Sequence, residues 1–150
     1  MLQEIDYLRQ IAVRCRDGRT LDPELANWLG TCLDAFLTHR VRHVDDAFGL
    51  RPTRGGVAWW REDALRKRDA ALRTLAQLHY DDMSHSVRAK AQAICRLSSR
   101  YAASTWRFDK ELHEMPANYA GTPKEYLWTA FQSGAPMPIG ERQLRAIIGK

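Results

Sequence analysis

The sequence has no hydrophobic run that approaches the roughly 18 residues needed to cross a membrane. Its first residues include Glu4 and Asp6, whereas a secretory signal begins with basic and then apolar residues. Cysteine is scarce, and the odd number of thiols forms no CxxC pair. Each falls on an expected helix, where a free cysteine acts as a small hydrophobe: Cys15, Cys32 and Cys95. We therefore expect a soluble, cytoplasmic protein in a reducing compartment, with no membrane partner.

The motifs that mark common enzyme classes are also missing, since the chain has no P-loop, GxGxxG, GxSxG or HExxH. Residues 111–114 (ELHE) contain acid–base groups, but a polar helix end explains them equally well. His39 and His43 are four residues apart near Asp46, a spacing that helical zinc ligands use, yet neighbouring arginines disfavour a cation there. We predict no enzyme activity, no metal site and no cofactor.

What the sequence does contain is apolar residues at three- and four-residue spacing, which predicts an all-α fold. At 150 residues, the chain is expected to form one helical bundle domain of five to seven helices. Gly18 is expected to end the first helix, and Asp22 to cap the second. One short turn is expected in 43–50, and the later helices are expected over about residues 58–79, 86–113, 122–134 and 140–148.

The helix expected over 86–113 is the longest, and it follows a turn at residues 81–84. Its apolar positions step alternately by four and three, which is typical of a seam that packs against other helices. The members of this seam are Val87, Ala91, Ile94, Ser98, Tyr101, Thr105, Phe108 and Leu112. The seam fits packing within one bundle or between two chains, so a homodimer is an open alternative.

Charge is distributed unevenly along the chain, whose net charge is +5. Residues 1–50 are acidic helices with a net charge of −2, residues 51–115 form a basic helical core of +5, and residues 116–150 form a hairpin of +2. No acid occurs between Met83 and Phe108. Such a local excess attracts a polyanion or an acidic protein surface, although a merely solvated basic face has the same composition.

The last two expected helices resemble a helix-turn-helix, with Ala130, Gly134, Leu144 and Ile147 in its small, turn and apolar positions. Thr122 and Glu125 predict a capping box at the start of the first of them. On the second, the polar face would offer Arg142, Gln143 and Arg145 to bases and phosphates. The turn is about four residues longer than usual, and a structural helical hairpin would show the same pattern.

The segment RPTRGG at residues 51–56 predicts a loop, because Pro52 and two glycines break the helical pattern. A flexible loop with Arg51 and Arg54 suits a minor groove or a phosphate backbone. The following WWR includes Arg61, and tryptophan beside arginine can stack on unpaired bases. The tryptophans could equally anchor the next helix, but Trp59 and Trp60 point about 100° apart, so both cannot be equally buried.

Four segments carry a resemblance: GLRPTRGG, WWREDALRKRDAALR, YAGTPKEYLWTAF and IGERQLRAII. Together they resemble short, uncharacterised proteobacterial and phage- or prophage-type proteins, over about the last two thirds of the chain. The resemblance implies a bacterial accessory or mobile-element context and no particular mechanism.

Two functions are predicted. The first is a non-enzymatic accessory protein that binds nucleic acid, most simply duplex DNA, through arginine-rich faces. Its contact residues would be Arg51, Arg54, Arg61, Arg88, Arg96, Arg100, Arg107, Arg142, Gln143 and Arg145. The alternative is a helical protein–protein interaction module, such as a phage-encoded inhibitor or adaptor of a host complex, anchored by an exposed tryptophan, Tyr119 and arginines.

Overall fold

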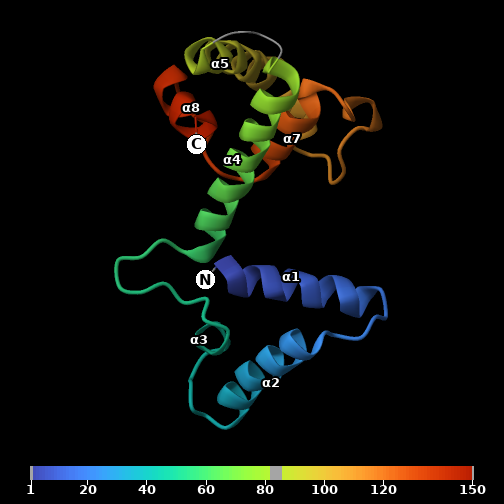
Figure 1. Cartoon of the computed structure of the whole chain (residues 1–150), viewed down its shortest axis with the longest axis vertical. Coiled ribbons are helices and arrows are strands. Elements are labelled where there is room, and N and C mark those ends of the chain that lie inside the picture. The colour runs from blue at the N-terminus through green and yellow to red at the C-terminus, as the bar shows by residue number, and fades with distance from the viewer. Residues whose placement is uncertain (1, 82–85, 150) are drawn as a thin grey trace. The chain divides into compact units, whose positions relative to one another are not determined.

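The computed structural model describes residues 2–81 and 86–149, and over these residues it contains helices and no strand (Figure 1). The predicted all-α class is confirmed. The longer helices are α1 (Leu2–Arg16), α2 (Pro23–Leu37), α4 (Trp59–Tyr80), α5 (Val87–Ser104), α7 (Pro123–Gln132) and α8 (Glu141–Ile148). Shorter elements are α3 (Val44–Ala47), α6 (Trp106–Asp109) and the 3-10 turn η1 (Ala117–Tyr119). Along the described residues, no helix is both long and apolar enough to span a membrane.

The chain forms two compact units, Met1–Glu62 and Asp63–Lys150, whose border falls inside α4. This border lies about one helical turn beyond the start of α4. It is therefore not at the change of charge near residue 50 that separates the acidic and basic segments of the sequence.

In the first unit, the buried core side chains are Ile5 and Ile11 of α1 and Leu25 and Cys32 of α2. Aromatic rings extend this core, because Trp28 meets Tyr7 edge-on at a centroid distance of 5.3 Å and Phe48 at 5.6 Å. The short turn predicted in 43–50 is confirmed as α3.

The turn between α1 and α2 confirms one prediction in full and another in part. Gly18 ends α1 in the left-handed conformation with φ 65°, as its position predicted. Asp22 is the N-cap residue of α2, as predicted, but its side chain makes no capping hydrogen bond. Its carboxylate instead accepts hydrogen bonds of 2.8 and 2.5 Å from the two Nη atoms of Arg14, because a bidentate guanidinium is a stronger donor than a backbone amide.

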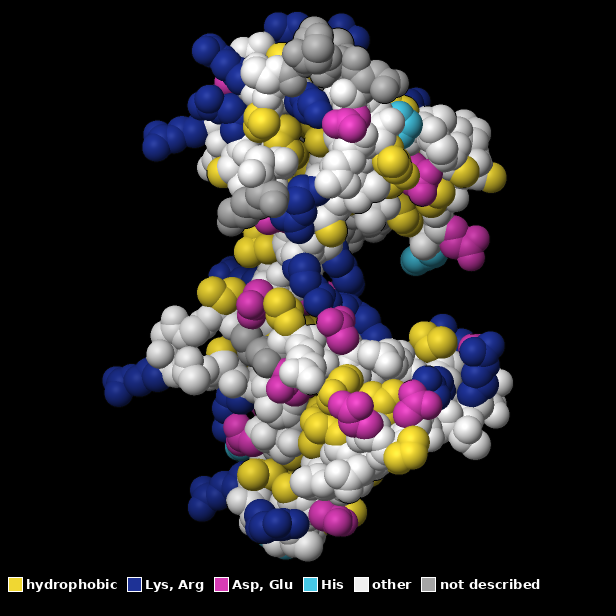
Figure 2. Space-filling view, viewed as in Figure 1, with side chains coloured by type: hydrophobic (Ala, Val, Ile, Leu, Met, Phe, Trp, Pro, Cys, Tyr) yellow, Lys and Arg dark blue, Asp and Glu magenta, His cyan; other side chains and the backbone are white. Residues whose placement is uncertain are grey.

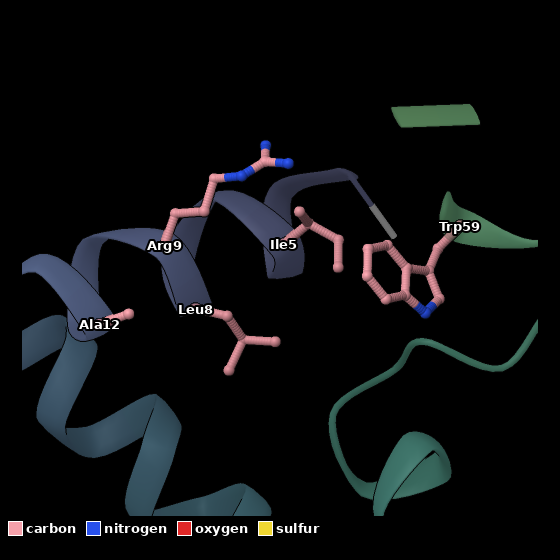
Figure 3. Close-up of a pocket in the computed structure, with 5 residues that line it drawn as sticks. All are labelled: Ile5, Leu8, Arg9, Ala12 and Trp59. Carbon is pink, nitrogen blue, oxygen red and sulfur yellow. The ribbon is translucent and has the colours of Figure 1, made fainter. Parts of the chain in front are cut away.

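Ala12, Cys15 and Leu37 have the three- and four-residue spacing of core positions, but all three are solvent-exposed. The first unit contains two long helices, α1 and α2, so only a narrow face of each helix is shielded from solvent. A cavity of about 240 Å³ remains beside α1, lined by Ile5, Leu8, Arg9, Ala12 and Trp59 (Figure 3). Trp59 faces this cavity while Trp60 is 59% exposed, which confirms that the two rings are not equally buried.

The core of the second unit is a cluster to which α4, α5, α7 and α8 all contribute. Its largest fully buried side chains are Leu72, Leu75, Ile94 and Leu127. Leu144 and Ile147 are buried from α8, as their spacing predicted. Leu65, an apolar residue of α4, is 37% exposed because it borders an open groove beside α8.

The helix predicted over 86–113 is wrong beyond Ser104, where α5 ends and the short α6 follows. The seam is correct for Ala91, Ile94 and Tyr101, which are buried. Its last members are not, since Phe108 is 65% and Leu112 42% exposed. Because the chain turns after α5, the buried side chain of this segment is the Asp109 carboxylate and not an apolar member of the seam.

That carboxylate, Asp109, is 5% exposed and accepts hydrogen bonds on Oδ2 from the Tyr101 and Tyr119 hydroxyls. The two donors compensate the desolvation of the carboxylate. Tyr119, expected among exposed contact residues, is buried by this arrangement, so that expectation is wrong.

The predicted capping box at the start of α7 is also displaced. Thr122 makes no capping hydrogen bond, and its hydroxyl donates to the Tyr119 carbonyl at 2.7 Å. The Glu125 carboxylate accepts from the amide of Gly121, one residue before the expected position. Of the turn predicted at 81–84, the part after Asp81 lies outside the described residues.

The helix-turn-helix-like hairpin is not confirmed. Gly134 ends the α7 segment with φ 77°, as expected, but eight residues, 133–140, separate α7 from α8. The principal neighbour of α8 is α5, and in Figure 1 α7 lies on the other side of α4. The packing of α8 against α5, and not against α7, therefore determines which side chains of α8 face the solvent.

Candidate nucleic-acid interface

A stripe of polar side chains runs along the solvent side of α5. Arg88, Gln92, Arg96 and Arg100 follow one another at four-residue spacing, which places successive side chains on neighbouring turns of one helix face. The opposite face of α5 carries the buried Ala91 and Ile94. Because α5 contains no Asp or Glu, its exposed surface has only basic ionisable groups.

Glu141, the first residue of α8, joins this stripe to α8. Its Oε1 atom lies 3.2 Å from Nε of Arg88 and 3.6 Å from Nε of Arg145. Its Oε2 atom accepts a hydrogen bond of 3.0 Å from Gln92. One carboxylate therefore holds two predicted contact residues from different helices on one surface, which we call the α5/α8 surface: Arg88, Gln92, Arg96, Arg100, Glu141, Arg142 and Arg145.

Three arginines of the α5/α8 surface are exposed and uncommitted: Arg96, Arg100 and Arg142. Among the described residues, no carboxylate oxygen lies within 4.0 Å of their guanidinium nitrogens. Figure 2 shows Lys and Arg side chains gathered over the α5 and α8 end of this unit. Unpaired arginines keep all their N–H donors for an anionic ligand.

The other predicted contacts of this unit are partly engaged within the protein. Arg107, on α6, stacks over the ring of Phe108 at 4.6 Å. Gln143 accepts a hydrogen bond of 2.9 Å from the Ile139 amide through Oε1, so only its amide donors are free. Gln143 is therefore committed to the start of α8 and cannot use both amide atoms for an adenine edge.

Arg51, Arg54 and Arg61 belong to the first unit. The structure confirms a loop at 51–56 before α4. Arg51 pairs with Asp46 at 2.7 Å and with Asp45 at 3.5 Å, so its charge is compensated. Arg54 and Arg61 are exposed.

Two residues that position the site escaped the sequence interpretation. The sequence interpretation singled out neither Glu141 nor Gln92, because a contact between helices some 50 residues apart has no local signature. Lys90 also adds charge to α5, but it donates a hydrogen bond to Asp81 at 2.9 Å. An acidic residue at the start of an otherwise basic helix was the available signal for Glu141.

The arrangement at His39 differs from a pair of helical metal ligands. α2 ends at Leu37, and His39 adopts a left-handed conformation with φ 58°, so His39 and His43 do not share a helical face. Within residues 2–81 and 86–149, no group of three or more His, Cys, Asp or Glu side chains is placed to hold a metal ion.

Comparison with known proteins gives no match to a family model, a curated protein or a solved structure. The functional argument therefore depends on the α5/α8 surface itself.

Proposed function

We propose that this protein is a non-enzymatic, cytoplasmic DNA-binding accessory protein of bacterial or phage origin, and that the α5/α8 surface contacts the phosphates of duplex DNA. The observation that carries this proposal is the set of exposed, unpaired arginines Arg96, Arg100 and Arg142. They share one surface with Arg88 and Arg145. An acid-free helix face with unpaired guanidinium groups has the charge and the donors that phosphate oxygens require.

The length of the stripe suits a short stretch of duplex. The Cα atoms of Arg88 and Arg100 are twelve residues apart, which corresponds to roughly 18 Å along a helix. B-DNA rises 3.4 Å per base pair, so such a stripe covers about five steps of one strand. Phosphate contacts of this kind fix position and supply affinity without reading sequence.

The test is fluorescence anisotropy of a labelled duplex of about 20 base pairs, titrated with the full chain at several salt concentrations. The variant Arg96→Ala/Arg100→Ala/Arg142→Ala removes the three unpaired charges. If each arginine neutralises one phosphate, the slope of log K against log salt becomes shallower by about 0.9 for each, or ~2.7 in total.

The matched control Arg16→Ala/Arg40→Ala/Arg42→Ala removes the same charge from exposed positions of the first unit. It is expected to retain most of the affinity and the wild-type salt slope. Equal losses in the two triple variants would show that net charge, and not the α5/α8 surface, drives binding. An affinity for the duplex that does not change with salt concentration would also overturn the proposal.

The alternative, a protein–protein interaction module, has one specific observation in its favour. Trp60 is 59% exposed beside the cavity lined by Trp59, and exposed tryptophans are frequent anchors of protein interfaces. A partner that copurifies with the wild-type chain after nuclease treatment, and is lost from Trp60→Ala, would favour this function over DNA binding.

A further inference from the structure

An apolar groove of about 460 Å³ lies beside α8 in the second unit. Its walls are Leu65 and Arg68 from α4, Ala146 and Ile147 from α8, and the segment 136–139 that leads into α8. Ile139, on its rim, is 92% exposed. An isoleucine that is almost fully exposed beside an apolar groove indicates a surface that gains from being covered.

The polar groups of the groove limit what can fill it. Pro136 and Pro138 have no N–H, the Pro136 carbonyl accepts from Arg68, and the Ile139 amide donates to Gln143. An extended peptide that adds as a strand needs a row of free backbone donors and acceptors, and this segment does not supply one. Recognition must therefore depend on side chains, as when a helix lays its apolar face in a groove.

The charged residues around the groove indicate the sign of the charge that a partner should carry. No carboxylate lines it, although the one lining arginine, Arg68, donates a hydrogen bond of 2.6 Å to its sequence neighbour Asp69. Arg142 precedes Ala146 by four residues and so stands next to the groove on the same side of α8, exposed and without a carboxylate partner among the described residues. Apolar walls with an unpaired cation at the rim complement an occupant that is apolar and acidic.

We infer that this groove, which we call the α4/α8 groove, is a docking site for a short acidic amphipathic helix of a partner protein. Its apolar face packs against Leu65, Ile139 and Ile147, and a carboxylate reaches Arg142. This inference does not depend on DNA binding, since the groove and the α5/α8 surface have only Arg142 in common.

The probe is a labelled synthetic peptide of about 14 residues, or four helical turns, with Leu along one face and Glu elsewhere. The full chain is titrated into it and anisotropy is recorded, with a scrambled peptide of the same composition as reference. We expect saturable binding of the amphipathic peptide and at least tenfold weaker binding of the scrambled one. Equal binding of the two peptides would overturn the inference, because it would indicate charge attraction alone.

Ala146→Glu places a carboxylate in the groove at an exposed helix position, and Ala102→Glu makes the same change on exposed α5. We expect the first to weaken the peptide about tenfold or more and the second to change it less than twofold. In the wild-type chain, the peptide should shift the methyl NMR signals of Ala146 and Ile147. Undisturbed signals, or an unaffected Ala146→Glu variant, would overturn the inference.

Light scattering of the wild-type and Ala146→Glu chains tests the competing occupant, a second copy of this chain. A dimer that Ala146→Glu converts to a monomer would overturn the acidic-helix assignment, whereas the same mass for both chains supports it. Arg96→Ala, which reports on the DNA surface, is expected to leave peptide binding unchanged, so failure of either proposal can be recognised separately.

Discussion

The Tyr101 hydroxyl donates a hydrogen bond of 2.6 Å to Oδ2 of Asp109, and the side chains of both residues are buried. The Tyr119 hydroxyl donates to the same oxygen at 2.9 Å. These bonds connect α5 and α6 to the turn that precedes α7. The rings of Phe131 and Trp106 pack beside Tyr101 at centroid distances of 5.2 and 6.2 Å. The buried Asp109 carboxylate therefore stabilises the end of α5 at Ser104, although the apolar spacing of the sequence continues to Leu112.

Tyr101→Phe is expected to lower the free energy of unfolding by about 1.5–3 kcal/mol, because it removes a buried hydrogen bond to a charged group. Urea denaturation followed by circular dichroism measures this loss. Tyr80→Phe is the matched control, since the Tyr80 hydroxyl makes no hydrogen bond to the described residues. A loss of similar size in both variants would contradict the role assigned to Asp109.

Stability is expected to fall at alkaline pH through the same cluster. Burial, followed by the hydrogen bond to Asp109, raises the pKa of both Tyr101 and Tyr119 above the usual value of 10.0. Below pH 10 both residues are protonated in the folded and unfolded chain, so their contribution is constant. Above pH 10 the unfolded chain releases these protons first, which favours unfolding by up to about 1.4 kcal/mol per pH unit for each group.

The measurement is urea denaturation between pH 9 and 11 for the wild type and for Tyr101→Phe/Tyr119→Phe. The double variant should lose less stability over this interval than the wild type. Parallel pH profiles for the two chains would disprove the link.

Glu141→Gln is expected to strengthen DNA binding. The substitution removes the carboxylate beside Arg88 and Arg145, so both guanidinium groups become fully available to phosphates. We expect affinity to rise several-fold at low salt and the difference to shrink as salt screens the charges. Glu114→Gln removes an equal charge at an exposed position away from this surface and is the control. Identical affinities for the two variants would argue against an α5/α8 interface.

The cysteines are expected to react with a thiol reagent at different rates. Cys15 is exposed, whereas Cys32 is buried and its pKa is raised by that burial. The thiolate is the reactive species, so Cys15 should be modified first and Cys32 last in the native chain. Mass spectrometry of the modified peptides over time measures the order. Modification of Cys32 at the rate of Cys15 would contradict the packing of α1 against α2.

The sequence predicted the helical class and most helix positions because these depend on local spacing. The three- and four-residue pattern is sufficient to place α1, α2, α4 and α8 near their observed bounds. Glycine at positions 18 and 134 marks helix ends, since its backbone can adopt positive φ. The unequal burial of Trp59 and Trp60 also followed from helix geometry, although only the structure shows that Trp60 is the exposed one.

Helix ends and caps that compete with nonlocal partners were not predictable. The apolar spacing beyond Tyr101 predicted that the same helix would continue. Instead, Asp109 is buried and accepts hydrogen bonds from Tyr101 and from Tyr119 of η1. Asp22 is a residue type that commonly caps helices, but its carboxylate accepts hydrogen bonds from Arg14 instead. In each case a stronger charged hydrogen bond, formed between separate elements, replaced the local one.

The sequence by itself determined that this chain is helical, has its excess of basic residues after residue 50, and carries no acid between 83 and 108. The tertiary structure decided which of those basic side chains are available. It paired Arg51 with Asp45 and Asp46, stacked Arg107 on Phe108, and left Arg96, Arg100 and Arg142 unpaired. The reason is physical: composition sets the number of charges, but only packing sets the distance between a cation and a carboxylate.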